Sequence, residues 1–152
     1  MATSPGKWSV LRTIVTAWLV VGSLDISSAF VIWISRGRAI TRGLQVIASG
    51  LLGSRALQGG MVTAGVGLAL HFFIALVVVA VFCIASRAIP TMKNQAVLAG
   101  VLYGIAVYLV MYWIVLPNAF PKFRHSLAND SLEFAIHIVL IGLPTALIAR
   151  RS

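Results

Sequence analysis

Four long apolar segments constrain this chain more than any other feature of its sequence. They run from Thr13 to Ile34, Met61 to Ser86, Gln95 to Leu116 and Leu132 to Ala149. A helix needs about 20 apolar residues to cross the hydrocarbon core of a bilayer, where every backbone polar group must be paired within the protein. Each segment reaches or approaches this length. We therefore predict one all-α domain, an integral membrane protein with four transmembrane helices.

The composition argues against the main classes of soluble protein. Of the 152 residues, 60% are hydrophobic and only 10% are charged. An average soluble domain is about one-quarter charged. A soluble domain of this length leaves roughly 30% of its unfolded surface exposed, so it could not bury so many apolar side chains. Soluble enzymes, nucleic-acid-binding modules and disordered chains are all disfavoured.

The segment from Arg38 to Gln58, between the first two spans, has a different pattern. Its apolar residues recur at helical spacing, and its polar residues form a stripe on the opposite face. The apolar stripe is Ile40, Leu44, Ile47 and Leu51, and the polar stripe is Arg38, Arg42, Gln45 and Ser49. This pattern predicts a short amphipathic helix that lies in the headgroup plane or partly re-enters the membrane. Three glycines in the segment favour the alternative, a polar loop.

The net charge of +9 comes from twelve Lys and Arg against three acids. These cations stand singly or in pairs between apolar segments, which favours binding to anionic lipid headgroups over binding to nucleic acid. The residues we assign to headgroups are Arg36, Arg38, Arg42, Arg150 and Arg151. Four spans place both termini on one side of the membrane. Six cations lie on each side, and we expect cytoplasmic termini because the first-loop cations can belong to the interfacial helix.

Small residues indicate where the helices approach one another closely, since lipid supplies no hydrophobic force between helices. Gly100 and Gly104 form a G-x-x-x-G pair in the third span, and Gly65 and Gly67 lie near the start of the second. We expect these glycines to face other helices of the bundle or another subunit. Proline residues are expected to shape the chain as well: Pro117 and Pro121 mark the turn after the third span, and Pro144 kinks the fourth.

Two ionisable residues lie deep inside the first two spans. Asp25 precedes the end of the first span by nine residues, or about 14 Å, and His71 follows the start of the second by ten, or about 15 Å. A carboxylate at bilayer depth costs about 2.5 to 3.5 kcal/mol, so it normally has a partner or a task. Both depths are measured from the side of the first loop. We predict that Asp25 and His71 face each other or share a water molecule.

A second pair, Glu133 and His137, opens the fourth span, and its i, i+4 spacing predicts one helix face near the membrane surface. We interpret it as a pair at the mouth of the bundle. The four ionisable residues can pair structurally, relay protons, bind zinc or iron, or hold haem between His71 and His137. A predicted depth difference of about 7 Å between the histidines disfavours haem. The spacing of Glu133 and His137 departs from the Glu-x-x-His motif of di-iron bundles. We expect no metal and no cofactor.

Several motifs from His71 onward recur together in a known family. They are Leu70-His71-Phe72-Phe73, the turn Ile89-Pro90-Thr91-Met92-Lys93, the span from Ala99-Gly100 to Pro117, and the closing span Ser131 to Arg151 with Glu133, His137, Arg150 and Arg151. In these motifs, over about half of its length, the chain resembles the YagU-like family of uncharacterised bacterial inner-membrane proteins. The resemblance implies a multi-pass protein of the bacterial inner membrane. Family members carry a longer polar insert after the first span, where this chain has the Arg38 to Gln58 segment.

Two functions remain open from the sequence. We expect a small non-catalytic subunit that packs within a larger energy-transducing complex. Its partners would be the lipid bilayer and other membrane-protein subunits. The alternative is a proton-linked channel or small transporter in which Asp25 and His71 carry the proton. An enzyme is disfavoured because the sequence offers no nucleophile with an adjacent base and no glycine-rich phosphate loop. We expect no catalytic residue and no nucleic-acid partner.

Overall fold

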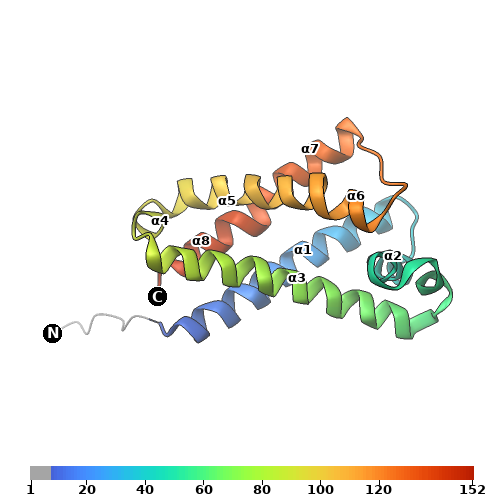
Figure 1. Ribbon diagram of the computed structural model, residues 1–152, viewed down its shortest axis with the longest axis horizontal. Helices are drawn as coiled ribbons and strands as arrows, with labels where there is room; N and C mark the ends of the chain where they lie inside the picture. The colour runs from blue at the N-terminus through green and yellow to red at the C-terminus, as the bar shows by residue number, and fades with distance from the viewer. Residues whose placement is uncertain (1–7) are drawn as a thin grey trace.

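The computed structural model describes residues 8–152, and this part of the chain is helical almost throughout (Figure 1). In chain order the α-helices are α1 (Val10–Ser35), α2 (Ile40–Leu52), α3 (Gly60–Ala88), α4 (Thr91–Asn94), α5 (Ala96–Val110), α6 (Leu116–Ala119), α7 (Leu127–Ile136) and α8 (Leu143–Ala149). A 3-10 helix, η1 (Gly53–Gln58), follows α2. Two π-helices, η2 (Met111–Val115) and η3 (His137–Gly142), join α5 to α6 and α7 to α8.

Four helical stretches are long and apolar enough to cross a membrane. They are Val10–Ser35, Gly60–Ala88, Ala96–Ala119 and Leu127–Ala149. The prediction of an all-α, multi-pass membrane protein with four transmembrane helices is confirmed. The fourth stretch begins at Leu127 instead of Leu132, because a helical first turn with Asp130 forms before the apolar run. An acidic side chain there interacts favourably with the positive end of the helix dipole.

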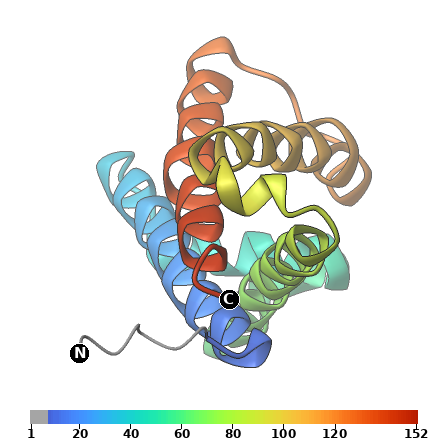
Figure 2. The same cartoon turned by 90° about the vertical axis from the view of Figure 1, so that its left-hand side faces the viewer.

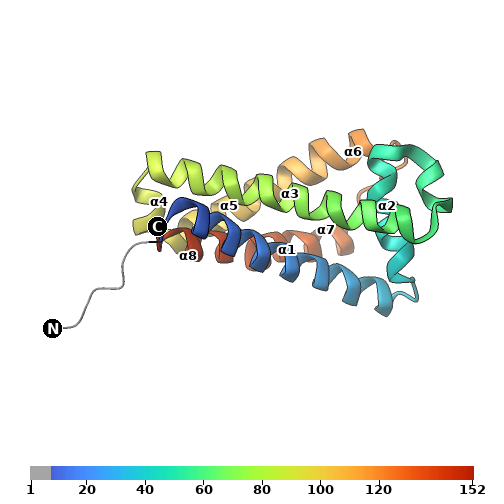
Figure 3. The same cartoon turned by 90° about the horizontal axis from the view of Figure 1, so that it is seen from below.

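Both ends of the described chain lie at the same end of the bundle, together with α4 (Figures 1 and 3). The backbone N–H of Trp8 donates to the carbonyl of Arg151 at 2.9 Å, which ties the start of α1 to the end of α8. We call this the termini end. The α1–α2 turn, η1 and the α6–α7 loop lie at the opposite end, which we call the loop end.

The helix formed by α7, η3 and α8 runs through the middle of the bundle, between α1 and α5 (Figure 2). Its α8 part also packs against α3. The main core lies toward the termini end, where α1, α3, α5 and α8 bury aliphatic and aromatic side chains. This core includes Val21, Val79, Phe82 and Ile141. Interior packing of this kind is dense, like that of other protein cores.

The segment predicted to be interfacial forms α2 and η1 and lies across the long axis of the bundle at the loop end (Figure 3). It packs on the first turns of α3. Two residues of its predicted stripes are placed differently: Gln45 is buried and donates to the carbonyl of Gly60 at 3.0 Å, whereas Leu51 is 69% exposed. The cause is the packing against α3, which covers the face that carries Leu44, Gln45 and Ala48. Its place in the headgroup plane stays a prediction.

Glycines set the closest helix crossings. A Cβ on Gly67 would overlap the backbone carbonyl of Leu44 in α2. A Cβ on Gly100 would lie 2.9 Å from the carbonyl oxygen of Gly142, and one on Gly104 would lie 2.6 Å from that of His137. Gly65 differs, because a Cβ there would meet nothing within 4 Å. No helix in the described residues packs on Gly65, so a contact with another subunit remains as its predicted role.

Pro117 and Pro144 each follow a π-helix, and Pro117 acts differently from the sequence prediction. Pro117 does not end the third span, which continues to Ala119, because the π-helix η2 leads into Pro117 in the first turn of α6. Pro144 likewise follows the π-helix η3 in the first turn of α8. A proline has no N–H, so inside a continuous helix it leaves a carbonyl of the preceding turn without its usual partner, and in both spans a widened π turn lies directly before it. In the fourth span the helix is widened over His137–Gly142, directly before Pro144, where the sequence predicts a kink.

Candidate functional site

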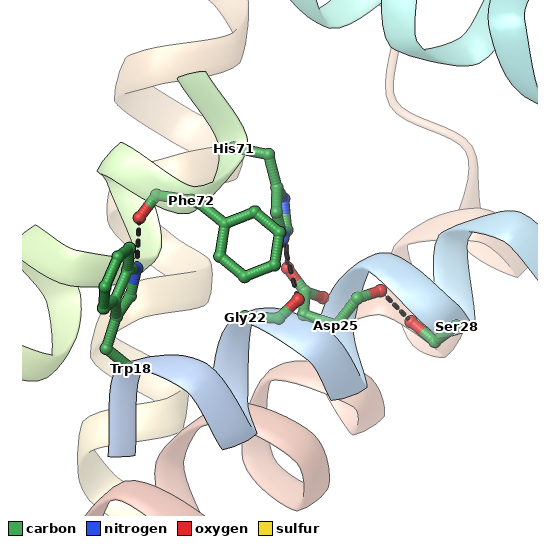
Figure 4. Close-up of polar contacts among 6 residues, drawn as sticks. All are labelled: Trp18, Gly22, Asp25, Ser28, His71 and Phe72. Carbon is green, nitrogen blue, oxygen red and sulfur yellow. Dashed lines mark hydrogen bonds and ion pairs between the residues drawn. The ribbon is translucent and has the colours of Figure 1, made fainter. Parts of the chain in front are cut away.

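The candidate site begins where α1 crosses α3 (Figure 4). The indole N–H of Trp18 donates to the backbone carbonyl of Phe72 at 2.7 Å, which bonds the two helices directly. A Cβ on Gly22 would lie 2.7 Å from the Phe72 ring. Only glycine therefore leaves room for this ring, and the close approach brings the neighbouring His71 to the backbone of α1.

His71 meets α1 through both ring nitrogens (Figure 4). Its Nε2 lies 3.0 Å from the carbonyl oxygen of Gly22, and its Nδ1 lies 3.9 Å from Oδ2 of Asp25. The side chain of His71 is 12% exposed and that of Asp25 is 29% exposed. The residues that the sequence placed at matching depths thus lie opposite each other, on the loop-end side of the main core. Ser28 adds a hydrogen bond to the backbone carbonyl of Asp25 at 2.7 Å.

Hydrogen-bond chemistry limits the protonation states of this pair. The carbonyl of Gly22 can only accept, so Nε2 of His71 carries a proton. If the second nitrogen and the Asp25 carboxylate were both unprotonated, a lone pair would face an anion in a region of low polarity. One further proton, on Nδ1 or on the carboxyl group, removes this repulsion. The separation of 3.9 Å is that of an ion pair and is too long for a direct hydrogen bond.

Glu133 and His137 do not pair through their side chains as the sequence predicted. Nδ1 of His137 donates to the backbone carbonyl of Glu133 at 2.8 Å, and the His137 side chain is buried. His137 follows Leu127 by ten residues, which is about 15 Å of helix, close to the depth of His71. The predicted depth difference between the histidines is wrong because the fourth span starts earlier. His137 lies within the bundle and not at its mouth.

Two tyrosines, which the sequence analysis did not single out, surround His137. The ring centroids of Tyr108 and Tyr112 lie 5.7 Å and 5.9 Å from that of His137, both edge-on. The tyrosine rings stack on each other at 4.7 Å. Their i, i+4 spacing near the end of the third span is a signal that could have found them. They enclose the imidazole within a largely aromatic wall.

The two pairs of ionisable residues lie in the same half of the bundle, and we call them the polar cluster: Asp25, His71, Glu133 and His137. The Asp25 carboxyl group is close enough to interact electrostatically with both His71 and His137. The charge of Asp25 in turn acts on Glu133. Three separate helices, α1, α3 and α7–η3, therefore contribute to it. Such a cluster can bind and redistribute protons within the membrane.

The polar cluster occupies only the loop-end half of the spans. The chain has no Asp, Glu, His, Lys or Arg in residues 13–24, 72–86, 94–111 and 138–149. These ranges are the parts of the four spans that lie between the polar cluster and the termini end. The apolar main core fills that half, so all four residues of the cluster lie on the loop-end side of the core.

Side chains at the loop end form a smaller polar group beside the cluster. Nδ1 of His125, to which the sequence analysis gave no role, lies 2.8 Å from Oδ2 of Asp130, and its ring stacks on Trp113. Arg36 donates to the side chain of Asn129 at 2.8 Å. These contacts hold the α6–α7 loop and the start of α7 against α1.

The arginines assigned to lipid headgroups are exposed at the two ends of the bundle. Arg42 donates to the carbonyl of Leu57 at 2.9 Å, and the guanidinium of Arg151 lies 5.3 Å from the ring centroid of Trp8. Arg38 and Arg150 are also exposed. Binding of headgroups by these residues stays a prediction.

Within residues 8–152, no three His, Cys, Asp or Glu side chains converge in a way that could hold a metal ion. No protein-family model, curated protein or solved structure matches the chain. The resemblance to the YagU-like family therefore stays a prediction.

Proposed function

We propose that this chain is a small non-catalytic subunit of a larger energy-transducing complex in the bacterial inner membrane, with both termini in the cytoplasm. The observation that supports this proposal is a set of small residues that face outward within the described part of the chain. Gly65 and Ala69 are exposed four residues apart on α3, and Ser23 and Ser27 are exposed four residues apart on α1. Small residues at this spacing let helix backbones approach closely. A helical glycine is less stable than alanine by about 1 kcal/mol, which a close helix contact at Gly65 would offset.

The one-sided position of the polar cluster supports a role inside an assembly. A proton that reaches Asp25 and His71 from the loop end meets the apolar core, where the spans carry no Asp, Glu, His, Lys or Arg. It must return or pass to a group outside the chain. A partner subunit against α1 and α3 could supply that group. The proposal thus assigns the cluster a role in holding or positioning a proton at an interface.

We expect the protein to co-purify with larger subunits when its native membrane is extracted in mild detergent. Mass spectrometry of the intact complex measures this directly. Substituting Gly65→Leu would fill the outward gap, and we expect recovery of partner subunits to fall by roughly tenfold, as a loss of about 1.4 kcal/mol implies. Val81→Leu, also exposed on α3, is the matched control and should leave recovery unchanged. A parent protein that runs alone in its native membrane extract would contradict the proposal.

A second candidate function, proton-linked transport, is favoured by the pairing of Asp25 with His71. In vesicles that contain the purified protein, we expect Asp25→Asn and His71→Ala to lower proton flux by at least about tenfold, because each removes a group that carries the proton. His125→Gln, a histidine change outside the polar cluster, should keep the flux of the parent. Equal flux from all four proteins, measured with a pH-sensitive dye, would remove this candidate.

A further inference from the structure

The two ends of the bundle differ in charge. The three acids of the chain, Asp25, Asp130 and Glu133, all lie in the loop-end half. The described part of the termini end carries five cations and no acidic side chain. These cations are Arg12, Arg87, Lys93, Arg150 and Arg151. Positive potential is therefore concentrated at one level of the spans, where no carboxylate side chain neutralises it.

A cavity of about 480 Å³ opens at this end, between the start of α1, the end of α3 and α4. It is lined by Trp8, Ser9, Val10, Arg87, Lys93 and Ser152. It is an open depression at the surface of the bundle. Its lining combines two cations with hydroxyl groups and an indole, which are hydrogen-bond donors that suit a phosphate group.

The donors of the cavity are only partly used within the chain. Lys93 donates to the backbone oxygen of Ser152 at 3.0 Å and to its hydroxyl at 3.1 Å, which leaves one N–H of the ammonium group. The Ser9 hydroxyl accepts from the N–H of Arg12 at 3.3 Å, so its own proton is available. Arg87 is exposed at the end of α3. An anion in the cavity would therefore meet three donors, two of them charged.

The surroundings of the cavity indicate the kind of anion. The guanidinium groups of Arg12 and Arg151 lie 4.5 Å and 5.3 Å from the ring centroid of Trp8, an arrangement that fixes an aromatic side chain at headgroup level. Large apolar residues close in sequence to the lining residues are exposed: Leu11, which follows Val10, is 72% exposed, and Ile89, two residues after Arg87, is 51% exposed. A ligand with a phosphate and acyl chains would satisfy both the donors and this apolar rim.

We propose that this cavity binds the phosphodiester headgroup of an anionic phospholipid, with Arg87, Lys93 and Ser9 as donors and the acyl chains against Leu11 and Ile89. A basic pocket between transmembrane helices is a known form of lipid recognition. The site lies at the opposite end of the bundle from the polar cluster, and it does not depend on the proposed function.

Native mass spectrometry of the detergent-solubilised full chain tests the site. The probes are phosphatidylglycerol, phosphatidylcholine and inorganic phosphate, added separately at equal concentration. We expect at least about fivefold more retained phosphatidylglycerol than phosphatidylcholine, and a drop of roughly thirtyfold in Arg87→Gln with Lys93→Gln, as loss of about 1 kcal/mol per cation implies. Arg38→Gln, a cation at the loop end, is the matched control and should retain the lipid within about twofold of the parent.

The single variant Arg87→Gln separates loss of binding from loss of folding. Arg87 is exposed, so its substitution leaves the contacts of Lys93 intact. We expect an intermediate loss of phosphatidylglycerol from a protein whose helix content, measured by circular dichroism, equals that of the parent. Equal retention by the parent and the folded Arg87→Gln variant would overturn the proposal. Retention of inorganic phosphate without phosphatidylglycerol would overturn it too, because the ligand would then be a free anion.

Discussion

Substituting Gly142→Ala is expected to separate the third and fourth spans, with a loss of more than about 3 kcal/mol in the free energy of unfolding, at the upper end of overpacking effects. A Cβ on Gly142 would overlap the carbonyl of Gly100, and it would lie 2.6 Å from the backbone nitrogen of Gly104. Both obstacles are backbone atoms of α5. A helix backbone cannot move aside as a flexible side chain can, so the helices themselves must part.

The matched control is the same chemical change at Gly65, where the added methyl group meets open space. Gly65→Ala should raise stability by about 0.5 to 1 kcal/mol, because alanine favours the helix. Titration of the detergent-solubilised proteins with SDS, followed by circular dichroism, measures both changes. Similar unfolding midpoints for the two variants would show that α5 and η3 do not cross at these glycines.

Substituting His71→Ala or Asp25→Ala is expected to lower the free energy of unfolding by about 2 to 4 kcal/mol, somewhat below the range for fully buried pairs because Asp25 is 29% exposed. The histidine change removes the hydrogen bond to Gly22 and leaves the carboxyl group unpaired. The aspartate change leaves the second ring nitrogen without its partner. Each variant keeps one polar group in a low-polarity region without compensation.

The double variant distinguishes a true pair from two independent residues. If the side chains share a proton, the loss in Asp25→Ala with His71→Ala should be smaller than the sum of the single losses by at least about 1 kcal/mol, which is a normal coupling for groups in contact. The same SDS titration supplies the three values. Ser23→Ala, exposed on the same helix, should change stability by no more than about 0.5 kcal/mol. Additive single losses would show that Asp25 and His71 do not interact.

Much of the fold follows from local sequence rules. The four spans are set by apolar length, and the G-x-x-x-G pair of Gly100 and Gly104 marks a real crossing, because small residues are needed wherever helices touch in lipid. The prolines were harder to interpret. Pro117 suggested a turn, yet a π-helix carries the chain into it without a break. Local propensity does not show whether neighbouring helices will support a widened turn.

The candidate site was only partly visible in the sequence. Equal helix depths were enough to place Asp25 beside His71, because depth is a property of each span alone. The position of His137 was misjudged because it depended on where the fourth span begins, and a polar first turn extends that helix to Leu127. The tyrosines beside His137 were missed, since their contact with it depends on how α5 and η2 pack against η3.

The sequence by itself determined that the protein has four apolar spans suited to lipid, and how far along each span its ionisable residues lie. These properties depend only on residue type and on position along a helix. Only the tertiary structure decided which helices are neighbours. It joins Asp25 and His71 to Glu133 and His137 in one cluster, directs Gly67 inward and Gly65 outward, and opens a basic cavity at the termini end. The physical reason is that packing depends on the rotation and crossing of whole helices, which small backbone contacts fix and which no single segment specifies.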